Sequence, residues 1–207
     1  MRGLLLKDWY TLIKQVKFFL LLILVFSVIG GGNMVAFAVV YAAMVPVTAL
    51  AYDEHAKWNS LAMMMPYSVE KIVFSKYILG YIAIAAAVLL AIAARWIMSM
   101  INHVPMDTGM WGMIFFSICA GMILLAVNLP MMFRLGVEKA RIVFFVILGL
   151  VVGIGMVAGK KIEMLLSSLI SPVQLMPTLL AVSAAVLLLS AGSVYVAIKL
   201  YRRRVLA

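Results

Sequence analysis

Six long apolar segments dominate this chain of 207 residues and limit what it can fold into. Apart from the short first one, each has about the 17 to 25 residues that a helix needs to cross a hydrocarbon core of roughly 30 Å. Because lipid offers backbone groups no hydrogen bonds, spanning segments must pair them internally, as helices do. The sequence therefore predicts an all-α, polytopic membrane protein, a single transmembrane domain over residues 1–207, with six transmembrane helices at residues 18–31, 34–52, 72–98, 110–133, 142–158 and 173–198.

The composition excludes a soluble protein and the charges predict the orientation. Hydrophobic residues make up 67% of the chain, more than a soluble core of this size can bury, and the formal net charge is +10. If the amino terminus is cytoplasmic, only Arg95, Lys160 and Lys161 of the 17 lysines and arginines lie outside. Cationic residues in short loops favour the inner side, so we expect a multi-pass protein with both termini cytoplasmic. The positive charge thus reflects topology, and no nucleic-acid partner is expected without a basic soluble domain.

Motifs for chemistry within this chain are weak. The nearest match to a phosphate loop, at residues 153–161, has lysine where serine or threonine should hold magnesium, so we expect no nucleotide cofactor here. Both histidines fall in predicted loops, and no acidic residue lies well inside a span. The spans therefore lack the groups that an intramembrane enzyme or an ion-coupled secondary transporter needs. A single cysteine, Cys119, excludes an intramolecular disulfide and a cysteine-based metal site.

Two features of the spans have more than one interpretation. Arg95, the one charge that we expect close to a span interior, either extends to the outer surface or contacts a substrate or gate. Gly149, Gly153, Gly155 and Gly159 form small-residue pairs that allow close helix packing, either inside one bundle or between subunits.

Between the second and third spans, residues 52–77 bring charged side chains into an otherwise apolar chain. Two short helices explain this segment best. Asp53 is placed to cap the first, with the next acidic residue at its positive amino end, and Pro66 breaks the chain. Ser68 then caps a second helix, which carries Glu70 in its first turn and continues into the third span. Such amphipathic helices either rest on lipid headgroups or dock into a groove of a soluble partner.

Residues 1–17 are predicted to form an amphipathic helix at the membrane surface, before the first span. Their apolar side chains recur near helical spacing and alternate with lysines and one aspartate. On the opposite side of the membrane, residues 159–172 alternate charge with a leucine-rich face and are expected to form an external re-entrant or interfacial segment.

Two motifs resemble one transporter family. The opening GLLLKDWYTLIKQ (residues 3–15) and the array DE..KWN, MPYS and KIV.SKY (within residues 52–77) are similar to the ABC type-2 transporter permeases, specifically the short, six-span group. The layout agrees over the whole chain. The departure is Val69-Glu70-Lys71, where members of that group often place an arginine after the serine.

The resemblance implies a partner that supplies ATP hydrolysis. In such permeases the loop between the second and third spans seats a coupling helix in a cytosolic ABC ATPase, which binds ATP and magnesium, while the amino-terminal helix is an elbow. The chain itself would then be no enzyme. Apart from the resemblance, the predicted inner loop at residues 133–141 is short and charged, so a minor partner contact is one interpretation of it. The residues expected to contact the ATPase are Asp53, Glu54, Lys57, Trp58, Asn59, Pro66, Tyr67, Ser68, Glu70 and Lys71.

The resemblance also implies a bacterial cytoplasmic membrane and a second permease subunit, identical or paralogous, with the first and fifth spans lining the seam. An apolar seam suits an apolar or amphipathic cargo, and related permeases export membrane-active peptides such as phenol-soluble modulins or peptide antibiotics. The alternative is a non-transporting immunity, sensor or scaffold protein that holds a cytosolic partner at the bilayer. The residues expected to line the seam are Phe18, Phe19, Phe26, Phe144, Phe145 and Met156.

Overall fold

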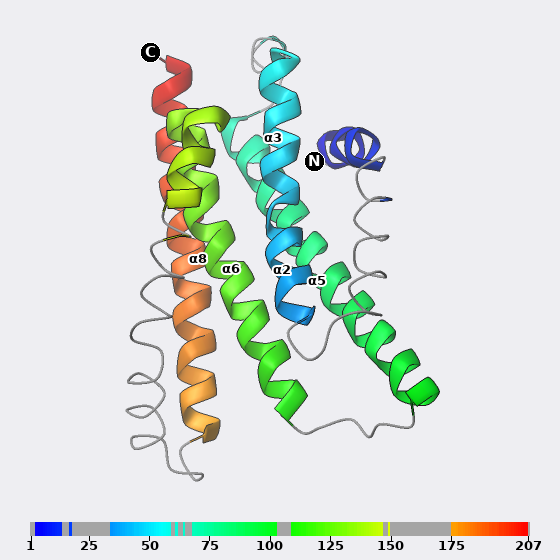
Figure 1. Cartoon of the computed structure of the whole chain (residues 1–207). Helices are drawn as coiled ribbons and strands as arrows, with labels where there is room; N and C mark the ends of the chain where they lie inside the picture. Colours follow the sequence, from blue (N-terminus) through cyan, green and yellow to red (C-terminus); the bar gives the residue numbers. More distant parts are fainter. Residues whose placement is uncertain are drawn as a thin grey trace.

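The computed structural model describes residues 3–13, 17, 34–58, 61, 64, 68–102, 109–146, 149 and 175–206. Within these ranges the chain forms α-helices joined by turns, and no described residue belongs to a strand (Figure 1). The prediction of an all-α membrane protein is confirmed. The predicted first span and the external segment at 159–172 lie outside the described residues.

Among the described residues, three helices are long and apolar enough to cross a membrane, and they coincide with the predicted third, fourth and sixth spans. They are α5 (Val69–Asn102), α6 (Gly109–Leu135) and α8 (Leu175–Leu206). Each continues past the predicted carboxyl end of its span. Leucine, alanine and methionine, which favour helices, are frequent in all three sequences.

The predicted second span is not one helix, because it is split into α2 (Met34–Ala43) and α3 (Val45–His55). Pro46 lies at the start of α3 and has no N–H to donate to the carbonyl four residues back. The chain therefore turns at Met44, whose N–H bonds the carbonyl of Tyr41 at 3.0 Å. This corrects the single helix expected over residues 34–52, and α3 also ends three residues later, at His55.

A one-residue turn at Gly136 joins α6 to the helix at residues 137–146. This helix starts five residues before the predicted fifth span (142–158), so the predicted inner loop at residues 133–141 is helical except at Gly136. Gly136 has a φ of 83°, in the left-handed region that glycine adopts readily. Its N–H donates to the carbonyl of Met132 at 3.0 Å, and its own carbonyl accepts from the N–H of Ala140 at 3.1 Å. Gly136 thus ends one helix and occupies the position directly before the first residue of the next.

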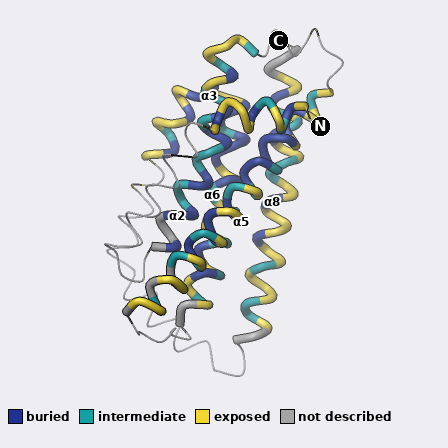
Figure 2. Tube along the Cα trace, turned by 90° about the vertical axis from the view of Figure 1, so that its right-hand side faces the viewer, coloured by how far each residue is buried: buried dark blue, intermediate teal, exposed yellow. Residues whose placement is uncertain are grey.

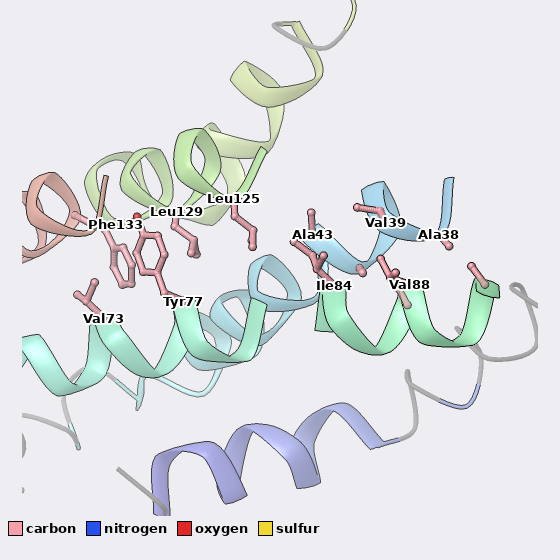
Figure 3. Packing of buried hydrophobic residues seen from close by; sticks show 14 of the residues in the cluster. Ala38, Val39, Ala43, Val73, Tyr77, Ile84, Val88, Leu125, Leu129 and Phe133 are labelled. Atoms are coloured by element: carbon pink, nitrogen blue, oxygen red, sulfur yellow. The ribbon is translucent and has the colours of Figure 1, made fainter. Parts of the chain in front are cut away.

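The core lies where α2, α5, α6 and α8 pack along their lengths (Figure 3). Helix α2 comes very close to α6, since a Cβ added to Gly121 would lie 2.5 Å from a methyl group of Val39. Nearer the carboxyl end of α6, Val73 and Tyr77 of α5 meet Leu129 and Phe133. The outward faces are different, because exposed leucines and valines and the exposed Tyr195 follow α8 along its length (Figure 2). A bilayer covers such apolar faces, as expected for a multi-pass membrane protein.

Both termini lie at one end of the bundle (Figure 1). There α3, α6 and α8 end, α5 begins, and the amino-terminal helix at residues 3–13 crosses beside α3, nearly perpendicular to it. We call this end the basic end, because it carries Lys57, Lys71 and Arg134 as well as Arg202 and Arg203 near the end of α8. We call residues 56–68 the connecting segment. Its described residues 56–58 follow the end of α3, and Ser68 precedes the start of α5, so both ends of the segment lie at the basic end.

Candidate functional site

The amino-terminal helix packs on the two helices that flank the connecting segment. Leu12 is buried in a small cluster with Ala49 of α3 and Leu79 of α5. Leu4, one end of the same face, belongs to the main core. Because residues four apart share one face of a helix, Asp8 between these leucines also points inward. The packing therefore brings a carboxylate against α3 and α5.

Four charged side chains form a closed cluster at this place, and we call Lys7, Asp8, Asp53 and Lys76 the ion cluster. The Nζ atom of Lys76 lies 2.8 Å from both carboxylate oxygens of Asp8 and 2.6 Å from Oδ2 of Asp53. The Nζ atom of Lys7 lies 2.5 Å from Oδ1 of Asp53 and 3.1 Å from Oδ1 of Asp8. Each lysine thus bridges both aspartates, and the cluster joins three separate helices.

The ion cluster is buried and has no net charge. The side chains of Lys76 and Asp8 are each 2% exposed, that of Asp53 is 12% exposed, and only Lys7, at 25%, has substantial contact with solvent. A buried charge is stable only when partners replace the water that it loses. Two lysines and two aspartates meet this condition, so the amino-terminal helix, the end of α3 and the start of α5 hold one another in a fixed arrangement.

Trp58 and a small cavity complete the surroundings. The ammonium group of Lys7 lies 4.2 Å from the centre of the Trp58 ring, a distance typical of a cation–π contact. Trp58 packs against the main core, so the beginning of the connecting segment is also held against the bundle. A cavity of about 20 Å³, the space that one water needs, borders Asp53, Glu54 and Lys76.

The structure corrects two predictions about charge. Asp53 does not begin a helix; it lies in the last turn of α3, with its carboxylate engaged by Lys7 and Lys76. Arg95 is not the one charge close to a span interior, because Lys76 is buried in α5. The sequence does contain a signal for this, since Lys76 follows Ile72 and Val73 at spacings of four and three and so shares their buried face.

Glu54 reaches from α3 to the start of the helix at residues 137–146. Its Oε2 atom accepts a hydrogen bond from the N–H of Val137 at 2.8 Å. The first N–H groups of a helix need outside acceptors, and Gly136 has no side chain to provide one. The expectation that Glu54 lies at the amino end of its own helix is wrong, because it lies near the carboxyl end of α3 and caps a different helix instead. The bond joins residues 83 positions apart.

At the far side of the connecting segment, the predicted start of α5 is confirmed. The N–H of Lys71 donates to Oγ of Ser68 at 3.4 Å, and α5 begins at Val69 with Glu70 in its first turn. Glu70 is exposed and forms an ion pair of 3.2 Å with Arg202 of α8. Lys71 and Lys57 are exposed too. Asn59, Pro66 and Tyr67 lie outside the described residues.

Of the predicted seam residues, the structure describes Phe144 and Phe145. Phe144 is buried within this chain and packs edge to face on Phe145, with ring centres 5.8 Å apart. Phe145 is exposed and points away from the core. Arg95 lies in α5, but the structure does not describe its side chain. Phe18, Phe19, Phe26 and Met156 lie outside the described residues.

Polar groups deeper in the bundle differ in how well they are paired. The Tyr77 hydroxyl and Oγ of Ser193 are 2.6 Å apart, and Ser193 also donates to the carbonyl of Ala126 at 2.5 Å, which connects α5, α8 and α6. Asn128 of α6 is buried, yet neither polar atom of its side chain contacts a hydrogen-bond partner in the described part of the chain. No three metal-binding side chains gather anywhere in that part either.

These observations identify the class to which the protein belongs. It is a helical, multi-pass membrane protein whose charged side chains gather at one end of the bundle, around the segment between its second and third predicted spans. The family model for the ABC-2 family transporter proteins matches residues 3–202, so the chain belongs to this family. It is therefore the transmembrane, non-catalytic component of an ABC transporter, a system that includes an ATPase partner. Neither a curated protein nor a solved structure matches the chain.

Proposed function

We propose that this chain is the permease subunit of an ABC exporter in a bacterial cytoplasmic membrane, with the basic end facing the cytoplasm and a cytosolic ATPase docked on the connecting segment. The main structural support for this proposal is the ion cluster. It joins the amino-terminal helix to α3 and α5, which are the two helices that enter and leave the connecting segment. A partner that moves this segment would move all three helices together.

The exposed residues around the connecting segment suit a soluble partner. Leu61 is 49% exposed and Met64 is 84% exposed, and the charged side chains of Lys57, Glu70 and Lys71 lie on either side of them in sequence. Exposed apolar residues bordered by charges are typical of protein interfaces, and methionine adapts to the shape of a partner. Asp53 has a different role in this proposal, because its carboxylate is already engaged inside the bundle.

Glu54 provides a route from this surface to the fifth span. It lies near the end of α3, directly before the connecting segment, and holds the first N–H of the helix at residues 137–146. Only Gly136 separates this helix from α6, so no long linker lies between the two helices. In this proposal, motion of the docked segment therefore reaches the fifth span through one charged hydrogen bond.

Reversing the charges of the docking surface should separate the ATPase from the permease. For Glu70→Arg combined with Lys71→Glu, we expect recovery of the ATPase with the tagged permease to fall about tenfold, as for a loss of about 1.4 kcal/mol. The matched control is Arg202→Gln, which removes the partner of Glu70 but keeps both surface charges. The measurement is quantitative mass spectrometry of the complex in mild detergent. Equal recovery from the reversed variant and the control would contradict docking at this surface.

Removing the carboxylate of Glu54 should affect coupling more than docking. We expect Glu54→Ala to keep the ATPase bound but to lower transport per ATP hydrolysed severalfold, with a stability loss of about 1 kcal/mol for the missing cap. The control is Glu138→Ala, which removes an exposed acid from the first turn of the same helix. Transport and hydrolysis are measured together in proteoliposomes. If both variants remain equally coupled, Glu54 does not transmit motion.

The proposed cargo is an apolar or amphipathic molecule, in particular a membrane-active peptide, and the proposed path lies between this chain and a second permease subunit. The exposed ring of Phe145 on the fifth-span helix supports an apolar path. Stimulation of ATP hydrolysis by amphipathic peptides in the reconstituted complex is the expected result. A complex that hydrolyses ATP but moves nothing across the membrane would instead support the immunity, sensor or scaffold function.

A further inference from the structure

A cavity of about 240 Å³ opens beside the break between α2 and α3. Met44, at the turn, and Val45 and Val47, beside Pro46, form one wall, and Arg141 and Phe145 of the helix at residues 137–146 form the other. Tyr41 and Thr48 also line it. The ion cluster and the caps described above do not use this cavity. Its volume suits a segment of a hydrocarbon chain rather than a folded molecule.

The cavity has a charged side and an apolar side along the axis of the bundle. The helix at residues 137–146 starts at the basic end, so Arg141 lies about 6 Å, one helical turn, nearer that end than Phe145. On the facing wall, Val45 and Met44 lie deeper than Thr48, because α3 ends at the basic end. The cation thus lies toward the membrane surface and the apolar walls lie toward its middle.

Arg141 is an exposed cation beside the cavity. No ion pair connects Arg141 to an acidic side chain among the residues that the structure describes, and this includes Glu138, one turn away. A guanidinium beside apolar side chains attracts an anionic group, and its planar fork matches the oxygens of a phosphate. The cavity therefore complements an anionic lipid, because its cation matches an anionic headgroup and its apolar walls match an acyl chain.

We propose that this cavity binds an anionic phospholipid from the leaflet at the basic end, with its phosphate on Arg141 and one acyl chain against Met44, Val45 and Phe145. Charge complementarity decides between lipids, because a basic residue near the surface favours anionic headgroups over zwitterionic ones. The site lies between α3 and the helix at residues 137–146, so a bound lipid would contact both. This inference is independent of the ATPase docking surface and of the cargo.

The test uses the full-length permease in mild detergent and two probes, phosphatidylglycerol and phosphatidylcholine with the same acyl chains. Native mass spectrometry should find one phosphatidylglycerol retained about fivefold more than phosphatidylcholine, the ratio that corresponds to about 1 kcal/mol per basic residue. Arg141→Gln should abolish this preference. Lys139→Gln, which removes an exposed cation that does not line the cavity, should keep it.

Three outcomes would overturn the proposal. They are equal retention of the two lipids by the unaltered protein, the same preference in Arg141→Gln as in Lys139→Gln, and the capture of a peptide cargo, but no lipid, by a photoreactive group at residue 145. The first comparison needs no substitution, so it stands even if a variant fails to fold. A failure of ATPase docking leaves all three measurements unaffected.

Discussion

Replacing Lys76 by methionine is expected to lower the free energy of unfolding by about 3 to 5 kcal/mol, because it leaves two buried aspartates with one lysine. Methionine has a similar length and an apolar side chain, so the change removes mainly the charge. The cost arises from the carboxylate of Asp8, which would lose its contacts of 2.8 Å and keep only the longer contact to Lys7. Denaturant unfolding of the purified protein in detergent provides the measurement.

A second substitution tests whether charge balance is the cause. Lys76→Met combined with Asp8→Leu removes one charge of each sign and leaves the pair of Lys7 and Asp53 intact. We expect the double variant to regain most of the lost stability, because apolar residues of similar volume replace buried ion pairs at little cost. Lys71→Met, at an exposed position on the same helix, should change stability by no more than about 0.5 kcal/mol. A double variant as unstable as the single one would show that the ion cluster is not the cause.

Asn128→Leu should have the opposite effect and stabilise the protein by about 1 to 3 kcal/mol. A buried amide without partners has lost its hydrogen bonds to water and gained none in return. Leucine has a similar volume, and Leu125, one turn before Asn128, and the adjacent Leu129 already lie in the core. Thermal unfolding of the two proteins under identical conditions measures the difference.

The comparison for Asn128 is a buried polar group that is paired. Ser193→Ala should destabilise by about 1 kcal/mol, since it removes the partner of Tyr77 and the donor to Ala126. If Asn128→Leu also destabilises, the amide has a partner in the folded protein. If it stabilises but lowers transport, the amide is retained for the transport cycle at the expense of stability.

The length and apolar character of the spans are local properties, and the sequence predicted them well. Helices α5, α6 and α8 lie where apolar runs of sufficient length occur, and the start of α5 follows from Ser68 and Glu70 at cap positions. The break at Met44 was also readable in principle, because Pro46 interrupts the second span. The expected helix at residues 34–52 did not include this break, because hydropathy measures how apolar a segment is and not whether its N–H groups can form helical hydrogen bonds.

The ion cluster and the Glu54 cap were less predictable, since they depend on contacts between distant segments. Asp53 followed by Glu54 fits the start of a helix as well as the end of one, and only the packing of α3 decides between the two. Lys7 and Asp8 lie in the first motif that resembled the family, and Lys76 lies in the second. Their pairing explains physically why charged residues occur on otherwise apolar helix faces, but the sequence does not indicate which charges meet.

Helix α5 is one uninterrupted rod, with no proline from Val69 to Asn102. Its 34 residues span about 51 Å, which exceeds the thickness of the hydrocarbon core. A rigid rod of this length that tilts by 10° about its midpoint moves its two ends by about 4 Å in opposite directions. A push near Ser68 toward the bundle axis would therefore appear at Asn102 as a displacement away from it. In the proposed transport cycle such a helix would act as a lever, because an inward movement at one end accompanies an outward movement at the other.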